Sequence, residues 1–183
     1  AEEFSKELSN KLGLNIYPVK SLEEAVHNSD VVNFATAGDN SPIIREEWLK
    51  EGVLLTIPSA AVLPEELYYK SKLVVSSWKM VIETAREEDE LSGSEKYRKS
   101  QDRPAMFVLK LVRSGKLKED EVIELGDVLT GKKLGRTSDK EIIISMTSGV
   151  PVQDAAWAYE VYKEAKRKGI GQELTLWNEP YWF

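Results

Sequence analysis

Short, mainly apolar runs recur along the chain and constrain its fold more than any other feature. Each is five or six residues long and lacks the alternation of polar and apolar residues that is typical of a strand with one solvent-exposed face. The runs are Val31 to Ala35, Val53 to Ile57, Leu73 to Ser77 and Glu141 to Met146. Strands of this kind are buried on both faces, which is typical of a parallel sheet covered by helices. The pattern predicts a doubly wound α/β fold.

Helical signals fill the segments between these runs. Phe4, Leu8 and Leu12 recur every four residues before Gly13, which predicts an amphipathic first helix with a glycine stop. Ser21 and Glu24 have the spacing of a capping box and predict a helix over Leu22 to His27. Further helices are predicted over Pro42 to Glu51, Pro64 to Tyr69, Pro104 to Val112, Glu119 to Leu129 and Val152 to Lys168.

Two segments outside this alternation also carry predictions. Asn15 to Val19 is expected to form an additional strand. Glu83 to Arg103 is rich in charged residues and serine, so we expect an exposed helix or loop that interrupts the sheet.

Composition excludes several classes of function. The 183 residues carry 31 acidic and 25 basic side chains, and a net charge of −6 disfavours nonspecific binding to nucleic acid or anionic membrane. Without cysteine and with one histidine, the chain can form neither a disulfide framework nor a thiolate or histidine metal site. No apolar run reaches the ~18 residues needed to cross a bilayer. We therefore expect a soluble cytoplasmic protein, of one domain by length, although a second lobe is not excluded.

Three loops that follow predicted strands are small and rich in hydroxyl groups. They are Ala35 to Gly38, Pro58 to Ala61 and Thr147 to Gly149. Ligands of a doubly wound sheet lie outside the carboxyl ends of its strands, where these loops are expected. Small residues let a flat ring approach the backbone, and the hydroxyls can hydrogen-bond its polar edge. Each loop alone is equally consistent with an ordinary turn, but three at one edge favour a ligand site.

The sequence resembles the family of ornithine cyclodeaminase, archaeal alanine dehydrogenase and μ-crystallin over essentially its whole length. The segments that carry the resemblance are, in chain order, Glu24-Ala25-Val26, Asp30-Val31-Val32, Ala35-Thr36, Pro42, Trp48-Leu49, Glu66-Leu67, Glu124-Leu125-Gly126, Gly131, Gly135-Arg136, Ser148-Gly149, Gln153-Asp154, Val161-Tyr162, Ala165, Gly169 and Gly171. The resemblance implies a homodimeric enzyme that moves hydride between NAD or NADP and an amino acid or imine.

The resemblance also implies roles for individual residues. Thr36 matches a threonine that contacts the cofactor, and Ile57, Pro58 and Ser59 match residues against its nicotinamide half. Thr147 stands in place of a cofactor-binding serine, and Ser148 in place of a residue beside the substrate. We expect no metal.

The sequence departs from the family pattern at the proton donor. Ala60 occupies the position of the usual aspartate, and Pro64 that of a lysine four residues later. Since alanine cannot transfer a proton, no catalytic residue is assigned and the usual cyclodeaminase mechanism is excluded. Pro58 replaces a glycine and removes an amide donor. Two interpretations remain: an imine reductase that takes its proton from water or another group, or a binding protein without turnover.

The phosphate-binding half of a dinucleotide site has no counterpart in the sequence. No glycine-rich turn precedes a helix, because Gly38 and Gly52 are isolated. Since the chain opens inside a helix, we expect an upstream piece to be absent. Residues 1–150 are interpreted as a Rossmann-like dinucleotide-binding domain without its first strands and glycine-rich turn. Residues 151–183 are interpreted as the final helix and tail of a dimerisation or substrate lobe.

Several other residues have both a functional and a structural interpretation. Glu65 and Glu66 lie near the expected crevice but more simply stabilise a helix start. His27 is expected on the surface, and Arg136 either binds an anion or forms a structural salt bridge. The aromatic tail, Trp177 to Phe183, is expected to dock on a missing lobe, a second subunit or the mouth of the active site.

Overall fold

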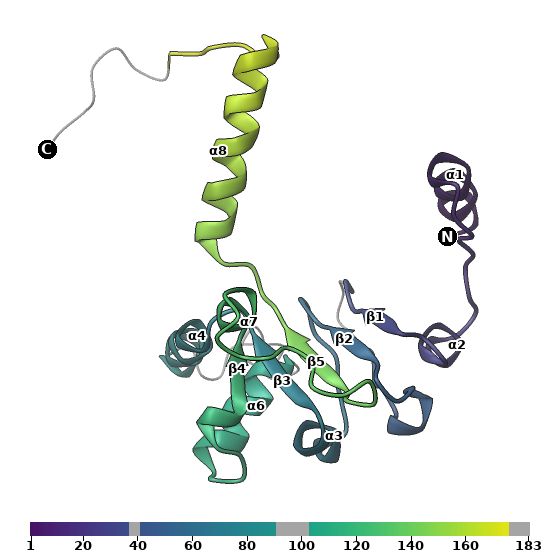
Figure 1. The fold of residues 1–183 in the computed structure, drawn as a ribbon, viewed down its shortest axis with the longest axis vertical. Helices are drawn as coiled ribbons and strands as arrows, with labels where there is room; N and C mark the ends of the chain where they lie inside the picture. The colour runs from purple at the N-terminus through teal and green to yellow at the C-terminus, as the bar shows by residue number, and fades with distance from the viewer. Residues whose placement is uncertain (37–40, 91–102, 176–183) are drawn as a thin grey trace, which may run out of the picture. The chain divides into compact units, whose positions relative to one another are not determined.

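A computed structural model describes residues 1–36, 41–90 and 103–175 of the chain. These residues fall into two compact units, Ala1–Ser148 and Gly149–Phe183. The first unit contains a five-stranded parallel sheet with flanking helices, which confirms the predicted fold class (Figure 1).

The sheet has the strand order β1-β2-β5-β3-β4. Its strands are β1 (Val31–Asn33), β2 (Leu54–Thr56), β3 (Lys72–Val75), β4 (Val122–Glu124) and β5 (Ile143–Met146). Ile143 pairs with Leu54 on one side and with Lys72 on the other, so the last strand in sequence is the middle strand in space. The loop after β5 is therefore placed between the loops after β2 and β3.

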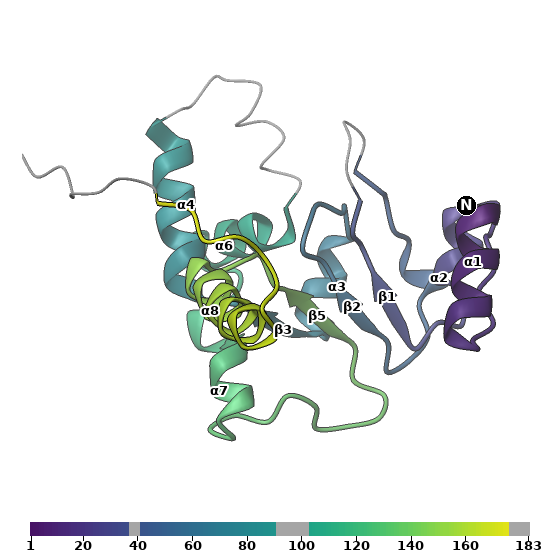
Figure 2. The same ribbon diagram turned by 90° about the horizontal axis from the view of Figure 1, so that it is seen from above.

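The helices of the first unit lie between the strands in sequence. They are α1 (Glu2–Leu12), α2 (Leu22–Val26), α3 (Glu65–Lys70), α4 (Trp78–Glu90), α6 (Pro104–Arg113) and α7 (Leu125–Leu129), with 3₁₀ turns at Glu46–Trp48 and Glu119–Glu121. In both views α2 lies beside β1, and α4 and α6 lie together on the other side of the sheet's middle strands (Figures 1 and 2).

Helix ends form where the sequence predicts them. The Ser21 hydroxyl accepts from the amide of Glu24 at 3.1 Å, and the Glu24 carboxylate accepts from the amide of Lys20 at 3.0 Å. This closes the N-terminus of α2 in the manner of a capping box. Gly13 ends α1 in the left-handed conformation, with φ of 65°, which costs a glycine little.

The core lies on and around the three middle strands. Leu55 of β2, Val75 of β3 and Ile144 of β5 are fully buried, and Leu67 of α3 and Val108 of α6 are buried against the same cluster. Burying one such side chain stabilises the fold by about 1.5–3 kcal/mol. The apolar runs that predicted the sheet thus form its interior.

Two predicted elements in the first third of the chain are wrong. Asn15 to Val19 forms no strand, because the described residues give it no partner strand, and Tyr17 is 75% exposed. Pro42 to Glu51 is not a helix, since Ile43 and Val62 form a parallel bridge that holds this segment extended. Only Glu46–Trp48 makes a 3₁₀ turn, although Trp48 and Leu49 do pack against the core as expected.

One further prediction needs correction. Glu119 to Leu129 is not one helix, because Val122 pairs with Leu73 and adds β4 to the edge of the sheet. The β-branched pair Val122-Ile123 suits a strand better than a helix. The charged segment Glu83 to Arg103 begins as the second half of α4, which agrees with the expected exposed helix, and its residues 91–102 lie outside the described part of the chain.

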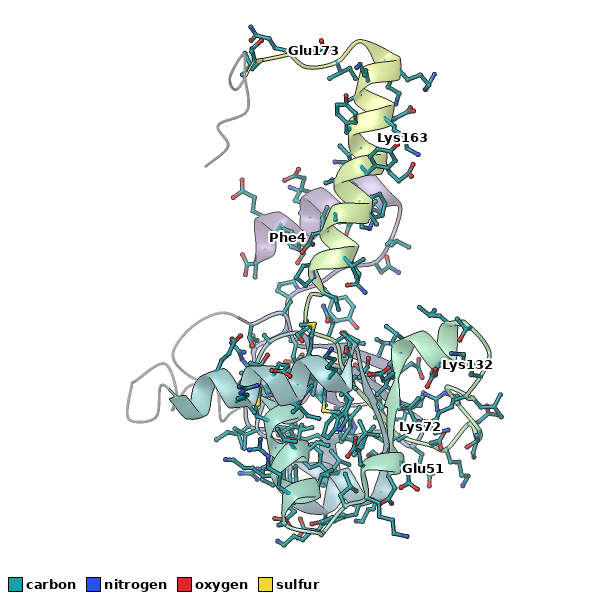
Figure 3. The ribbon with its side chains drawn as sticks, turned by 90° about the vertical axis from the view of Figure 1, so that its left-hand side faces the viewer. Phe4, Glu51, Lys72, Lys132, Lys163 and Glu173 are labelled. Carbon is teal, nitrogen blue, oxygen red and sulfur yellow. The ribbon has the colours of Figure 1, made fainter. Side chains whose placement is uncertain are left out.

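The second unit is built on α8 (Pro151–Lys168), which confirms the predicted final helix and ends at Gly169 with φ of 65°. None of the residues of α8 is buried, and Trp157, Tyr159 and Tyr162 are 56–72% exposed. Figure 3 shows the side chains of this helix, with Lys163 labelled. The predicted docking tail, Trp177 to Phe183, lies outside the described residues. Within the described ranges no helix is long and apolar enough to cross a membrane.

Candidate functional site

The loops after β1 and β2 are joined through two hydroxyl side chains. Ser59 accepts a hydrogen bond from the amide of Thr36 at 3.3 Å and lies 3.2 Å from the Thr36 hydroxyl. The Ser59 hydroxyl also donates to the carbonyl oxygen of Phe34. Thr36 in turn donates to the carbonyl oxygen of Ala60, at 3.4 Å. The two predicted residues therefore lie side by side.

These bonds limit what the two hydroxyls can offer a ligand. A hydroxyl has one hydrogen to donate and two lone pairs that accept. The hydrogen of Ser59 is used on Phe34, and that of Thr36 is shared between Ser59 and Ala60. Ser59 already accepts from the Thr36 amide, so it keeps a lone pair for a bound molecule only when Thr36 donates its hydrogen to Ala60. In that arrangement an amide NH₂ is a suitable partner for either hydroxyl.

The central position of β5 brings the third loop to the same edge. Ser148 follows β5, and its carbonyl oxygen accepts from the Ser76 hydroxyl, which follows β3, at 2.8 Å. Loops after β1, β2, β3 and β5 thus meet at the carboxyl edge of the sheet.

A cavity of about 210 Å³ opens at this edge. One wall consists of residues 57–59 after β2, with Met146 and Ser148 at the end of β5. The rest of the lining consists of Met80, Val81 and Thr84 on α4 and residues 103–106 at the start of α6. Pockets for a drug-sized ligand measure roughly 300–1,000 Å³, so this cavity suits one ring-sized group.

The lining is mainly apolar and includes the hydroxyl side chains of Ser59, Thr84 and Ser148. Among the described residues that line it, Arg103 is the one ionisable side chain, and its guanidinium does not release a proton in proteins. The cavity as described therefore contains no group that could act as a general acid or base.

The structure brings most of the predicted site residues together. Ile57, Pro58, Ser59 and Ser148 all line the cavity. Thr36 reaches it through Ser59 and is not part of the lining. Thr147 is half-buried and lies beside the cavity without lining it, in the described structure.

The structure also shows where the two residues that depart from the family pattern lie. Ala60 contributes its carbonyl oxygen to the bond with Thr36. Pro64 is the N-cap of α3, so a side chain there would lie at a helix start.

The sequence analysis assigned none of the lining residues on α4 and α6 to the site. Met80 and Thr84 belong to a helix whose start was not predicted, and Arg103 was assigned to an exposed segment. The start of α4 depends on tertiary contact, because the amide of Trp78 donates to the Glu124 carboxylate at 2.7 Å, from β4. No local signal in the sequence links these two residues.

The remaining candidates have structural roles. Hydrogen bonds from Tyr69 and Lys116, at 2.7 and 2.9 Å, lower the pKa of Glu65 and connect α3 to the loop after α6.

Arg136 donates to the carbonyl oxygens of Glu141 and Gly52, at 2.6 and 2.9 Å. It therefore holds the loop before β5 through backbone hydrogen bonds rather than through a salt bridge. His27 is exposed at the end of α2. Within the described ranges no three acidic or histidine side chains are placed to hold a metal ion.

Comparison with known proteins settles the relationship of the chain. The sequence model of the ornithine cyclodeaminase/mu-crystallin family matches residues 1–169. The chain belongs to this family. The resemblance stated from individual segments is thus confirmed.

Two relatives are named as enzymes that act on amino acids or imines. N-((2S)-2-amino-2-carboxyethyl)-L-glutamate dehydrogenase of Staphylococcus aureus is 29% identical, over 90% of this chain and 43% of its own length. Delta(1)-pyrroline-2-carboxylate reductase of Bacillus cereus is 25% identical, over 96% of this chain and 50% of its own length. The chain therefore spans about half the length of the relatives it matches.

A solved structure shares the fold. An archaeal alanine dehydrogenase dimer with bound NAD superposes with a TM-score of 0.68 at 24% identity, over 96% of this chain and 49% of that chain. At this identity the likeness establishes the architecture of the sheet and its helices.

Proposed function

We propose that the protein is an oxidoreductase that moves hydride between a nicotinamide cofactor, NAD or NADP, and an amino acid or imine. The observation that carries the proposal is the cavity at the carboxyl edge of β2 and β5, lined by Ile57, Ser59 and Ser148. Ligands of doubly wound sheets lie at this edge. Membership of the ornithine cyclodeaminase/mu-crystallin family supports the same assignment.

The residues present fit the nicotinamide half of the cofactor. The cavity has the size of a single ring, and its lining, with Ile57, Met146 and Val81, is mainly apolar. Ser59 supports the fit because, when Thr36 donates to Ala60, one lone pair of the Ser59 hydroxyl can accept from the carboxamide NH₂. When bound, the nicotinamide ring supplies or accepts the hydride. The sequence contains no glycine-rich turn for the pyrophosphate.

The lack of a proton-transferring side chain in the described cavity favours reduction or oxidation over ammonia loss. A departing amine must be protonated, and Ala60 cannot do this. Hydride transfer to an imine that arrives protonated from solvent needs orientation but no side-chain acid. The apolar lining holds the reacting groups together and excludes water.

A spectrophotometric assay of the protein tests the proposal. NADH and NADPH are each offered with pyruvate plus amines and with cyclic ketimines, and cofactor oxidation is followed. We expect one of the two cofactors to be oxidised with at least one imine. No oxidation of either cofactor, although both are seen to bind, would refute the enzyme assignment.

A second candidate function, binding without turnover, is favoured by Ala60 itself. Calorimetry that detects cofactor binding, together with an assay that detects no turnover, would support binding without catalysis. The variant Ala60→Asp then separates the two cases. If the wild type shows no turnover, turnover gained by this variant indicates a site that has lost its acid. If the wild type is active, unchanged activity in the variant indicates that the proton comes from solvent or another group.

We also propose that the protein forms a homodimer. The support is that Trp157 and Val161, four residues apart on one face of α8, are 72% and 59% exposed. Such large apolar side chains are stabilised by a partner surface. Sedimentation of the protein tests this, with Trp157→Glu expected to shift the population toward monomer.

A further inference from the structure

Glu124 lies outside the cavity but bonds to the helix that forms part of its lining. It is the last residue of β4 and pairs in register with Val75, the last residue of β3. Three residues after Val75, Trp78 begins α4, and its amide donates to the Glu124 carboxylate at 2.7 Å. Glu124 itself is not among the described residues that line the cavity. It therefore links the edge of the sheet to the start of α4.

A carboxylate at this place stabilises the start of the helix in two ways. The amides of a first helical turn have no acceptor within the helix, and the Glu124 carboxylate satisfies that of Trp78. The negative charge also interacts favourably with the positive end of the helix macrodipole. Because the first turn of α4 has no acidic residue of its own, this charge comes from β4.

Two serines connect the start of α4 to the cavity from the other direction. The Ser77 hydroxyl accepts from the amide of Met80 at 3.4 Å. The Ser76 hydroxyl donates to the carbonyl oxygen of Ser148 at 2.8 Å. Met80 and Ser148 both line the cavity. The start of α4 is thus held by β4 and by the loop after β5.

The position of α4 sets the shape of the cavity. Met80, Val81 and Thr84 line the cavity, and Val81 is also buried in the core together with Ala85. Protein interiors are close-packed, so a displaced α4 changes the core and the cavity together. A misplacement of about 1 Å that begins far from the chemistry can lower a rate on the order of 100-fold.

We propose that Glu124 is a positioning residue: through its bond to the start of α4, it holds the cavity in the shape that orients the reacting nicotinamide ring. This inference rests on the proposed function. Glu124 acts through α4 and exchanges no proton with the reactants.

Kinetics of Glu124 variants test the inference. Glu124→Ala removes the acceptor, whereas Glu124→Gln loses the charge but keeps an oxygen that can accept from Trp78. In Glu124→Ala we expect kcat to fall about tenfold and KM for the imine to change less than about threefold, because the ring is misoriented. Glu124→Gln should recover most of kcat.

Asp120→Ala is the matched control, because Asp120 is an exposed acidic residue on the turn before β4. It should leave kcat and KM unchanged. Glu124→Asp withdraws the carboxylate from α4 by one methylene group. It should show a smaller loss of kcat than Glu124→Ala, and it replaces Glu124→Ala in every comparison if that variant does not fold.

A binding comparison gives a readout that general destabilisation does not move. The cofactor is titrated calorimetrically beside the same molecule without its nicotinamide, which is ADP-ribose for NAD and 2′-phospho-ADP-ribose for NADP. In the wild type the ring should add affinity. In Glu124→Ala binding of the whole cofactor should weaken while binding of the ring-free molecule stays the same.

Hydrogen exchange of the α4 amides separates this inference from the proposed function. Exchange should be faster in Glu124→Ala than in the wild type or Asp120→Ala, because the start of α4 opens more often. Faster exchange together with lost affinity for the ring supports the inference even if no imine is reduced.

Two results would overturn the inference even if the wild type is an active oxidoreductase. One is unchanged exchange in Glu124→Ala, and the other is faster exchange with kcat and affinity for the ring retained. A wild type that binds neither the cofactor nor its ring-free counterpart would refute the proposed function and this inference together.

Discussion

The hydroxyl oxygens of Thr36 and Ser59 lie 3.2 Å apart and join the ends of two neighbouring parallel strands. Ser59 also accepts from the Thr36 amide and donates to the carbonyl oxygen of Phe34. Because Ser59 lines the cavity, this contact fixes the wall of the candidate site as well as the two loops.

Ser59→Ala should destabilise the protein and weaken cofactor binding together. The change leaves the Phe34 carbonyl and the Thr36 amide without this partner, at a cost of about 1–2 kcal/mol. Thermal unfolding and a fluorescence titration with NADH measure the two effects. A double-mutant cycle with Thr36→Val should give a coupling of about 0.5–1 kcal/mol. Strictly additive effects would show that the two hydroxyls act independently.

Gly52→Ala should be strongly destabilising. Gly52 has φ of 77°, and an added Cβ would lie 2.0 Å from the carbonyl oxygen of Asp139. Gly131→Ala is a matched control, because φ is 74° there and nothing lies within 4 Å of the added atom. The control should cost about 1–2 kcal/mol for the left-handed backbone alone. Urea unfolding that gives equal losses for both variants would contradict the clash.

Glu141→Gln should lose stability in a pH-dependent way. Burial raises the pKa of Glu141, but hydrogen bonds from Thr137 and Lys72 outweigh it and hold the pKa of this carboxyl below its usual range. The carboxylate lies 3.1 Å from the ammonium of Lys72, which Figure 3 labels. Since the folded pKa is depressed, the stabilisation is full above the unfolded pKa and is lost as pH falls through the folded one.

Unfolding by urea at a series of pH values checks this sign. The wild type should exceed Glu141→Gln by about 1 kcal/mol at pH above about 6, and the difference should vanish in acid. Glu160→Gln is the control, because the Glu160–Lys163 pair, at 2.7 Å, is exposed and such pairs contribute little. A difference that grows as pH falls would be inconsistent with a lowered pKa.

Leu55→Ala should cost about 2–5 kcal/mol, the range for removing a buried leucine side chain. Leu55 is fully buried on β2, beside the middle strand. Leu134→Ala, at a side chain 70% exposed, should change stability by less than about 0.5 kcal/mol. Chemical denaturation measures both, and equal losses would place Leu55 outside the core.

The sequence predicted those parts of the fold that local chemistry specifies. Val53 to Ile57 and Glu141 to Met146 formed strands because continuous apolar runs need burial on both faces. Ser21 and Gly13 fixed helix ends through their own side chain or lack of one. Prediction was wrong for Asn15 to Val19 and for β4, because a strand exists only with a hydrogen-bonded neighbour, and that neighbour is distant in sequence.

The candidate site, like the fold, could be predicted from the sequence only in part. The residue types of the hydroxyl loops at Thr36, Ser59 and Ser148 were evident from the chain, because each loop directly follows a strand. Only the tertiary structure decided that these loops adjoin, since β5 pairs between β2 and β3 although it comes last in sequence. It alone placed Arg103 at the same cavity, because strand order and helix packing depend on contacts between distant residues, which local propensity does not encode.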